Sequence, residues 1–247
     1  LMPGAAGFGT MASLTGTLAG AKTGADDRAA NALAYVSPSF SGFSGTVAYV
    51  NGENKLKNDQ EAVTAVPTLS GSLINKLVAG TATPADLGIS EGKINNRAWQ
   101  VAAQYDNGPA YAALGYHKTY DFGNVSELDA RVWRAAGSYT FPTNTKLTAL
   151  YDNTKLDGNG EYTKRSAWSL GVAQSFGKNT VGLEYARSGN LKTDQGTVDN
   201  SKANIVSALY TYEISKRTSV HARYSRLAND DASKANFYLN PVANPIS

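Results

Sequence analysis

The stretch RSAWSLGVAQSFG, residues 165–177, decides the fold class of this chain. Its large apolar side chains stand at every second position, at Trp168, Leu170 and Val172, and small or polar residues occupy the positions between them. A period of two is the spacing of a β-strand whose two faces meet different surroundings. The stretch therefore predicts a strand with one apolar face and one face of small and polar side chains.

Alternation of this kind recurs in ten segments of the chain. The segments cover residues 29–36, 43–50, 97–105, 110–117, 132–141, 146–153, 166–176, 180–187, 205–214 and 219–226. No long amphipathic helix competes with them, so we predict an all-β fold.

The connections between these segments alternate in length. The short ones are turns centred on Asn107-Gly108-Pro109, Pro142-Thr143-Asn144, Gly177-Lys178-Asn179 and Ser215-Lys216-Arg217. The long ones are loops over residues 51–95, 118–131, 154–165 and 188–204. Short turns and long loops then fall on opposite ends of one antiparallel up-and-down sheet. This asymmetry is typical of an outer-membrane β-barrel, with tight periplasmic turns and long external loops.

Aromatic side chains stand near both ends of the predicted strands. Trp99, Trp133 and Trp168 lie toward the long loops. Those toward the short turns are Tyr105, Tyr139, Phe141, Phe176 and Tyr212. Two such girdles mark the two interfaces of a membrane. A soluble β-sandwich would share the alternation, but it would explain neither the girdles nor the alternating loop lengths.

Composition excludes several classes of function. The chain has 247 residues, 23 Lys and Arg against 20 Asp and Glu, and no Cys. The lack of Cys excludes disulfides, Cys-ligated metals and a Cys nucleophile, and we expect no cofactor. A net charge of +3 is too weak to indicate a nucleic-acid partner. No apolar run approaches the roughly 20 residues of a helical membrane span.

Several stretches of the sequence resemble a known family more closely than alternation alone would explain. They are DDRAANALAYVSPSFSGFSGTVAYV (26–50), WQVAAQYDNGPAYAALGYH (99–117), RAAGSYTFPTNTKLTALYDNTK (134–155), AWSLGVAQSFGKNTVGLEYARSGNL (167–191) and YTYEISKRTSVHARYS (210–225). In these stretches the chain resembles the general diffusion porins of Gram-negative bacteria, in the branch found in beta-proteobacteria. The resemblance covers most of residues 26–226.

The resemblance implies an outer-membrane channel. Porins of this branch are sixteen-stranded, usually trimeric barrels that pass small hydrophilic solutes, and their third external loop folds inward to narrow the pore. We therefore expect a homotrimer whose partners are outer-membrane lipid, lipopolysaccharide, small hydrophilic solutes and anions.

The ends of the chain depart from the family pattern. Aligned by eye, residues 1–27 resemble the end of the inward-folded loop, and residues 51–95 form a long external loop. The first 24 residues lack the charged and apolar regions of a signal peptide, so either a signal was removed or the chain begins internally. The chain ends NPVANPIS, without the closing strand and its terminal aromatic residue. We expect a single barrel domain over 1–247, with ten or eleven strands and without the N-terminal strands and the closing strand.

Selectivity of a pore comes from its width and from charges that face the water. The resemblance makes Arg28 a member of the basic cluster opposite the inward-folded loop. Alternation places further charged side chains on the water-facing side, because an unpaired charge facing lipid costs about 2 to 4 kcal/mol. They are Arg134, Lys146, Arg223, Asp152, Glu184 and Glu213. Basic residues slightly outnumber acidic ones in this set, which favours a mild preference of the pore for anions. Each residue could instead solvate the wall or pair with a charge on a neighbouring strand.

A barrel enzyme and a structural or adhesin barrel are the alternative functions. Catalysis would need a nucleophile and a base, but His117 and His221 both fall within strands and neither belongs to a recognisable Ser/His/acid arrangement. Flux of solutes would identify a pore, hydrolysis of lipid or peptide would identify an enzyme, and the absence of both would favour an adhesin.

Overall fold

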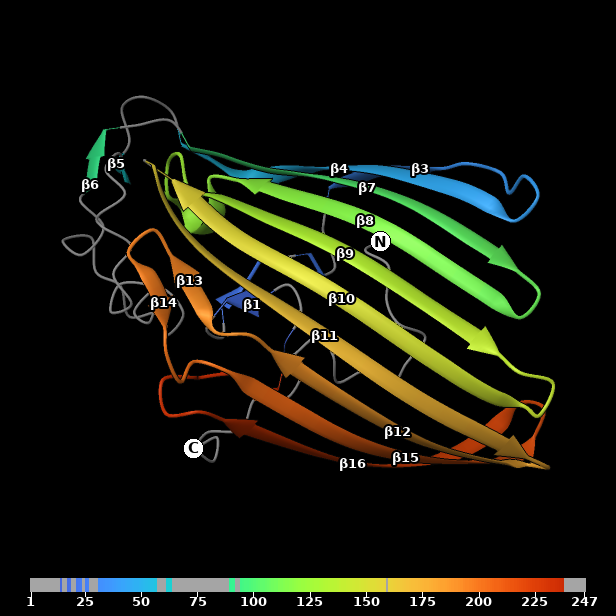
Figure 1. Cartoon of the computed structure of the whole chain (residues 1–247). Coiled ribbons are helices and arrows are strands. Elements are labelled where there is room, and N and C mark those ends of the chain that lie inside the picture. The colour runs from blue at the N-terminus through green and yellow to red at the C-terminus, as the bar shows by residue number, and fades with distance from the viewer. Residues whose placement is uncertain are drawn as a thin grey trace.

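A computed structural model of the chain shows one large antiparallel sheet (Figure 1). The residues that the structure describes are 14, 17–18, 21–23, 25–26, 31–56, 61–63, 89–91, 94–158 and 160–237. Ten strands pair in meander order. They are β3 (Ala32–Val36), β4 (Phe43–Leu56), β7 (Ile94–Asn107), β8 (Ala110–Tyr120), β9 (Asp129–Thr140), β10 (Thr145–Gly158), β11 (Glu161–Phe176), β12 (Asn179–Ser188), β15 (Ala203–Ser215) and β16 (Thr218–Asn229). Each of the ten predicted segments contains one of these strands, so the prediction of an all-β up-and-down sheet is confirmed.

The sheet is curved and has two edges in the described part of the chain. β3 and β16 stand at the ends of the strand order and do not pair with each other there, so this sheet is not closed into a barrel (Figure 1). Among the described residues no helix is long and apolar enough to cross a membrane.

The strands extend further toward the long loops than the alternation indicated. The predicted loop over 154–165 is wrong, because β10 and β11 stay paired as far as Gly158 and Glu161. Outward positions here carry charged side chains such as Lys155 and Lys164 instead of apolar ones. The sequence therefore no longer alternates between apolar and polar residues, although the backbone pairing continues. The region predicted as the loop 188–204 likewise contains the short strands β13 (Leu191–Thr193) and β14 (Gly196–Val198).

Smaller elements complete this end of the sheet. A single 3₁₀ turn, η3 (Phe122–Asn124), lies between β8 and β9. Within the long connection between β4 and β7, β5 (Glu61–Val63) pairs with β6 (Ile89–Glu91). The remainder of residues 57–93 lies outside the described residues.

The turns at the opposite end are tight, as predicted. Gly108 and Gly177 have φ of 58° and 57°, and Asn144 has φ of 60°. These left-handed conformations suit Gly and Asn and allow the chain to reverse within a few residues.

The convex face of the sheet is apolar and exposed, whereas the concave face carries small, polar and charged side chains, many of which are buried. Trp168 is 39% exposed while the adjacent Ser169 is 0% exposed, and the two side chains point to opposite faces. Aromatic rings on neighbouring strands contact each other across the convex face, with ring centres 4.7 Å apart for Tyr49 and Trp99 and 4.4 Å apart for Tyr116 and Trp133. An apolar outer face with aromatic rows is the arrangement that lipid requires of a membrane barrel.

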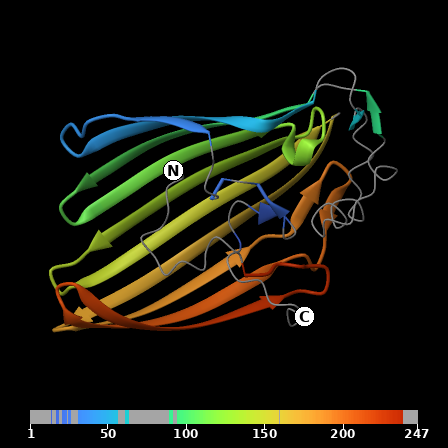
Figure 2. The ribbon, with the colours of Figure 1, turned by 180° about the vertical axis from the view of Figure 1, so that it is seen from behind.

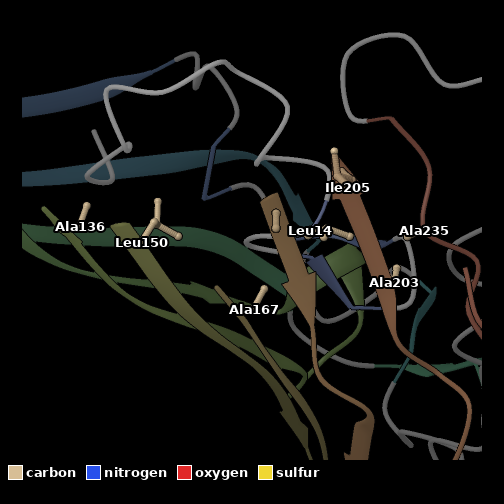
Figure 3. Close-up of a cluster of buried hydrophobic side chains, with 8 residues drawn as sticks. Leu14, Ala136, Leu150, Ala167, Ala203, Ile205 and Ala235 are labelled. Atoms are coloured by element: carbon tan, nitrogen blue, oxygen red, sulfur yellow. The ribbon is translucent and has the colours of Figure 1, made fainter. Parts of the chain in front are cut away.

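A segment from the N-terminal region lies on the concave side of the sheet. It includes β1 (Thr17–Leu18) and β2 (Ala21–Lys22), and Figure 2 shows β1 within the curve of the strands. Leu14, which is 1% exposed, packs against inward-facing alanines and Ile205 of the sheet (Figure 3). The members of this cluster are Leu14, Ala136, Leu150, Ala167, Ala186, Ala203, Ile205 and Ala235. The small alanine side chains leave room for the segment to approach the wall closely.

Candidate functional site

The candidate site is the concave face, whose side chains are fixed by the strand register. Directly opposite residues of neighbouring strands share a face, so Thr148, Gly171 and Glu184 lie in one inward row across β10, β11 and β12. Ser207 of β15 continues that row. Three of these four residues are polar, whereas the convex face opposite them carries Leu, Val and Tyr side chains.

Arg134 is the centre of a buried charged cluster on this face. It lies directly opposite Asp152 in the β9–β10 hairpin, and its Nε donates to Asp152 Oδ2 at 3.0 Å. Its two terminal nitrogens donate to the two carboxylate oxygens of Asp26, at 2.5 and 2.7 Å. The Arg134 side chain is only 3% exposed and that of Asp152 is 1% exposed. Two carboxylates therefore balance this arginine, away from bulk water.

The same cluster holds the N-terminal segment against the wall. Asp26 is bound by both terminal nitrogens of Arg134, and Ala25 packs against Val132 of the same strand. The Thr119 hydroxyl donates to the backbone oxygen of Thr23 at 3.3 Å. Three separate contacts to β8 and β9 thus hold Thr23, Ala25 and Asp26 on the concave face.

The other predicted residues share this face but not this cluster. Lys146 lies opposite Ala173, Glu213 opposite Ser219 and Arg223 opposite Leu209, all on the inward side by register. Glu184 is 3% exposed. Arg28 lies outside the described residues. The structure therefore brings together Arg134 and Asp152 and leaves Lys146, Glu184, Glu213 and Arg223 at separate places along the wall.

Two residues of the cluster were missed by the sequence analysis. Arg165, which is 3% exposed, interacts electrostatically with Asp152 from β11. Alternation would have placed it inward, but the interpretation of 154–165 as a loop removed it from consideration. Asp26 was not among the predicted site residues, and its contact with Arg134 joins residues 108 positions apart.

The two histidines make hydrogen bonds with hydroxyl groups. His117 Nε2 lies 2.8 Å from Thr119 Oγ1, and the His221 ring lies between the hydroxyls of Thr211 and Ser219, at 3.0 and 2.9 Å. Among the described residues, no carboxylate is hydrogen-bonded to either imidazole ring, as the acid of a Ser/His/acid triad would be. Within the described ranges no group of three His, Cys, Asp or Glu could hold a metal ion.

Comparison with known proteins identifies the family. The family model described as Gram-negative porin matches residues 2–232. Outer membrane porin protein 32 of Delftia acidovorans is 30% identical over 217 residues, which cover 85% of this chain and 50% of that protein. An outer membrane porin protein of Bordetella pertussis is 26% identical over 211 residues, covering 81% of this chain and 52% of that protein. The chain spans about half the length of these curated relatives.

The fold agrees with this family. A solved porin structure refined at 1.8 Å resolution superposes with a TM-score of 0.52 at 17% identity, covering 81% of this chain and 57% of that chain. The resemblance to the beta-proteobacterial porins is confirmed, and so is the expected location in the Gram-negative outer membrane. The chain belongs to the Gram-negative porin family.

Proposed function

We propose that the chain forms the wall of a water-filled channel for passive diffusion of small hydrophilic solutes and ions. The observation that carries this proposal is the separation of the two faces of one sheet. The convex face exposes apolar residues such as Leu170 and Leu183, at 58% and 57%, while charged and hydroxyl side chains line the concave face. Family and fold are those of a channel and not of an enzyme.

Residues 1–27 are proposed to be the loop that narrows this channel. The described part of the segment lies on the concave side (Figure 2), held by the contact between Asp26 and Arg134 and by Leu14 among inward alanines. A segment fixed to the wall by buried charge would set the pore width without blocking the remaining cross-section.

A mild anion preference is the second part of the proposal. Arg134 is balanced by Asp26 and Asp152, so the preference would depend on the remaining cations of the wall. Those proposed to face water are Arg28, Lys146 and Arg223, against Glu213, while Glu184 lies on the same face but is buried. Wall charge biases ion permeation because a pore about a nanometre wide is comparable to the Debye length near physiological salt.

The proposed assembly is a homotrimer in a membrane of outer-membrane lipid and lipopolysaccharide. In porins of this branch the subunit contacts involve mainly the first strands and the last one. The convex face over 110–214 should therefore contact lipid, as its exposed apolar residues suggest. A cross-link between subunits from within 110–214 would contradict this arrangement.

The test is the reversal potential of full-length protein in a planar bilayer under a salt gradient. We expect weak anion preference that grows as salt is diluted. Lys146→Gln and Arg28→Ala should each reduce it, whereas Lys178→Gln, at the short-turn end, should leave it unchanged. Cation preference, or reversal potentials unaffected by both substitutions, would contradict the anion assignment. Absence of any current would contradict the channel itself.

A further inference from the structure

Hydroxyl side chains form a row on the concave face, at the short-turn end of four neighbouring strands. The strands are β11, β12, β15 and β16, which lie side by side at one edge of the sheet (Figure 1). Ser175 lies directly opposite Thr180, Thr180 is opposite Thr211, and Thr211 is opposite His221. Ser219 stands two positions from His221 on β16 and faces the same side. We refer to these five residues as the hydroxyl row.

Hydrogen bonds within the hydroxyl row hold its side chains in place. Ser175 Oγ lies 2.9 Å from Thr180 Oγ1. The His221 ring lies between two hydroxyls, with Nδ1 3.0 Å from Thr211 Oγ1 and Nε2 2.9 Å from Ser219 Oγ. Ser175, Ser219 and His221 are exposed, and the other two residues are half-buried. A solute that binds here therefore meets side chains that are already ordered, which lowers the entropy cost of binding.

The hydroxyl row keeps hydrogen-bonding capacity for a solute. A hydroxyl has one donor and two acceptor lone pairs, so one bond to a neighbour leaves most of this capacity free. Carboxylates only accept and ammonium or guanidinium groups only donate, whereas hydroxyls do both. A sugar hydroxyl also donates and accepts, and it can replace water at the row without leaving a donor or an acceptor unpaired. The chemistry of the row thus suits a neutral polyhydroxylated solute better than an ion.

The next row of the concave face leaves room for such a solute. By register it consists of Lys146, Ala173, Gly182, Leu209 and Arg223. Ala173 and Gly182 stand two positions from Ser175 and Thr180 on the same strands, and they are too small to fill the space above the wall. Because neighbouring strands lie about 4.8 Å apart, roughly 19 Å of wall separates the two cations at the ends of this row. A solute seated over Ala173 and Gly182 therefore lies against the hydroxyl row, with the cations at its margins.

We propose that the hydroxyl row binds neutral polyhydroxylated solutes, sugars and polyols, as they pass through the channel. The inference rests on the proposed channel function and names one class of solute for it. Strands of membrane barrels tilt by about 35–45°, so a row across neighbouring strands advances about 3 Å along the pore axis with each strand. A solute can thus move along the pore by exchanging one hydroxyl for the next, and each step replaces a hydrogen bond by an equivalent one.

The test is the ion current through full-length protein in a planar bilayer, titrated with sucrose. Bound sugar reduces the current, and the concentration that gives half of the reduction measures the affinity. Thr180→Val with Thr211→Val removes two hydroxyls at nearly constant shape and should raise this concentration roughly 25-fold, about fivefold per hydrogen bond. Thr180→Ser with Thr211→Ser keeps both hydroxyls and should bind sucrose within about twofold of the parent protein.

Thr46→Val with Thr140→Val is the matched control. Both threonines lie on the concave face, but their cross-strand neighbours there are Val36, Ala102 and Lys146, which carry no hydroxyl. This control should leave the half-saturation concentration within about twofold. A polyethylene glycol of the same hydrodynamic radius, whose chain oxygens only accept hydrogen bonds, should reduce the current equally in the parent and in all three variants.

Equal half-saturation concentrations of the two valine variants would overturn the proposal, as would a polyethylene glycol that discriminates between them as sucrose does. Binding should not change between about 0.1 and 1 M KCl, and a strong dependence on salt would assign it to Lys146 and Arg223 instead. Equilibrium binding of radiolabelled sucrose in detergent micelles should rank the same proteins in the same order. Absence of current with this order intact would contradict the proposed channel alone, whereas loss of the order in both assays would overturn the binding site.

Discussion

Replacing Arg134 by glutamine tests whether buried charge holds the N-terminal segment against the channel wall. The substitution leaves the carboxylates of Asp26 and Asp152 facing each other without the guanidinium, in a site where Asp152 is 1% exposed. Removing one partner from a buried ion pair costs about 3–5 kcal/mol. Asp26 is 18% exposed and the Thr154 hydroxyl still donates to Asp152, so we expect the lower end, about 3 kcal/mol.

A double-mutant cycle measures the interaction between Arg134 and Asp26. Asp26→Asn alone leaves the pair of Arg134 with Asp152 intact and should cost only about 1–2 kcal/mol. The combined variant should be less destabilised than the sum of the two, with a coupling energy of about 2 kcal/mol. Free energies of unfolding are measured by urea titration in detergent micelles, with fluorescence of the three tryptophans as the signal.

Trypsin provides a second readout that is local to the segment. Cleavage after Lys22 requires the segment to leave the wall, so a loss of about 2 kcal/mol in docking should accelerate it roughly 30-fold. Lys178→Gln serves as a control that should not change the rate. An Arg134→Gln protein as stable as the parent, with an unchanged cleavage rate and no coupling to Asp26, would refute this explanation.

Three further substitutions test the packing of the sheet. Leu170→Arg puts a charge on the convex face and should destabilise the folded protein in lipid bilayers by about 2–4 kcal/mol. Gln104→Arg, on the concave face, should change the free energy of unfolding by under about 0.5 kcal/mol. Equal effects of the two substitutions would contradict the assignment of the convex face to lipid. Gly42→Ala should lower the free energy of unfolding by about 1–3 kcal/mol, because φ is +89° there and a Cβ would lie 3.0 Å from the backbone oxygen of Asp106. Gly45→Ala is the control, because its Cβ would meet its nearest atom at 3.8 Å. Equal urea midpoints of the two variants would show that Gly42 does not relieve strain. Leu14→Ala should weaken docking of the N-terminal segment by about 2–3 kcal/mol, seen as faster trypsin cleavage after Lys22, and an unchanged rate would show that the cluster of Figure 3 does not hold the segment.

The strand order and the facing of side chains could be predicted from the sequence because both depend on short-range patterns. Alternation over a few residues identifies a strand and its apolar face, and a short turn fixes the register of its hairpin. Arg134 and Asp152 lie nine residues before and after Thr143, the centre of a predicted turn, so their direct opposition follows from the turn alone.

Other features depend on information that no local pattern contains. β10 and β11 stay paired beyond Thr154, past the part of the convex face that carries apolar side chains. Outward side chains such as Lys155 and Lys164 are charged there, so alternation of apolar and polar residues no longer identifies the strand. The contact between Asp26 and Arg134 joins residues 108 positions apart in the chain, a distance that no turn or strand pattern spans. The assignment of Arg28 to the constriction remains a prediction.

If the proposed channel is correct, one face of this sheet borders a conducting pore while the other borders lipid. Because the chain contains no Cys, single cysteines at two adjacent positions of β7 can distinguish the two faces. Bilayer current through full-length Gln104→Cys protein should fall in steps when a charged, water-soluble thiol reagent is added. The Ala103→Cys protein, whose new thiol faces the convex side, should keep its full current. Equal responses of the two proteins, or a block confined to Ala103→Cys, would contradict the assignment of the concave face to the pore.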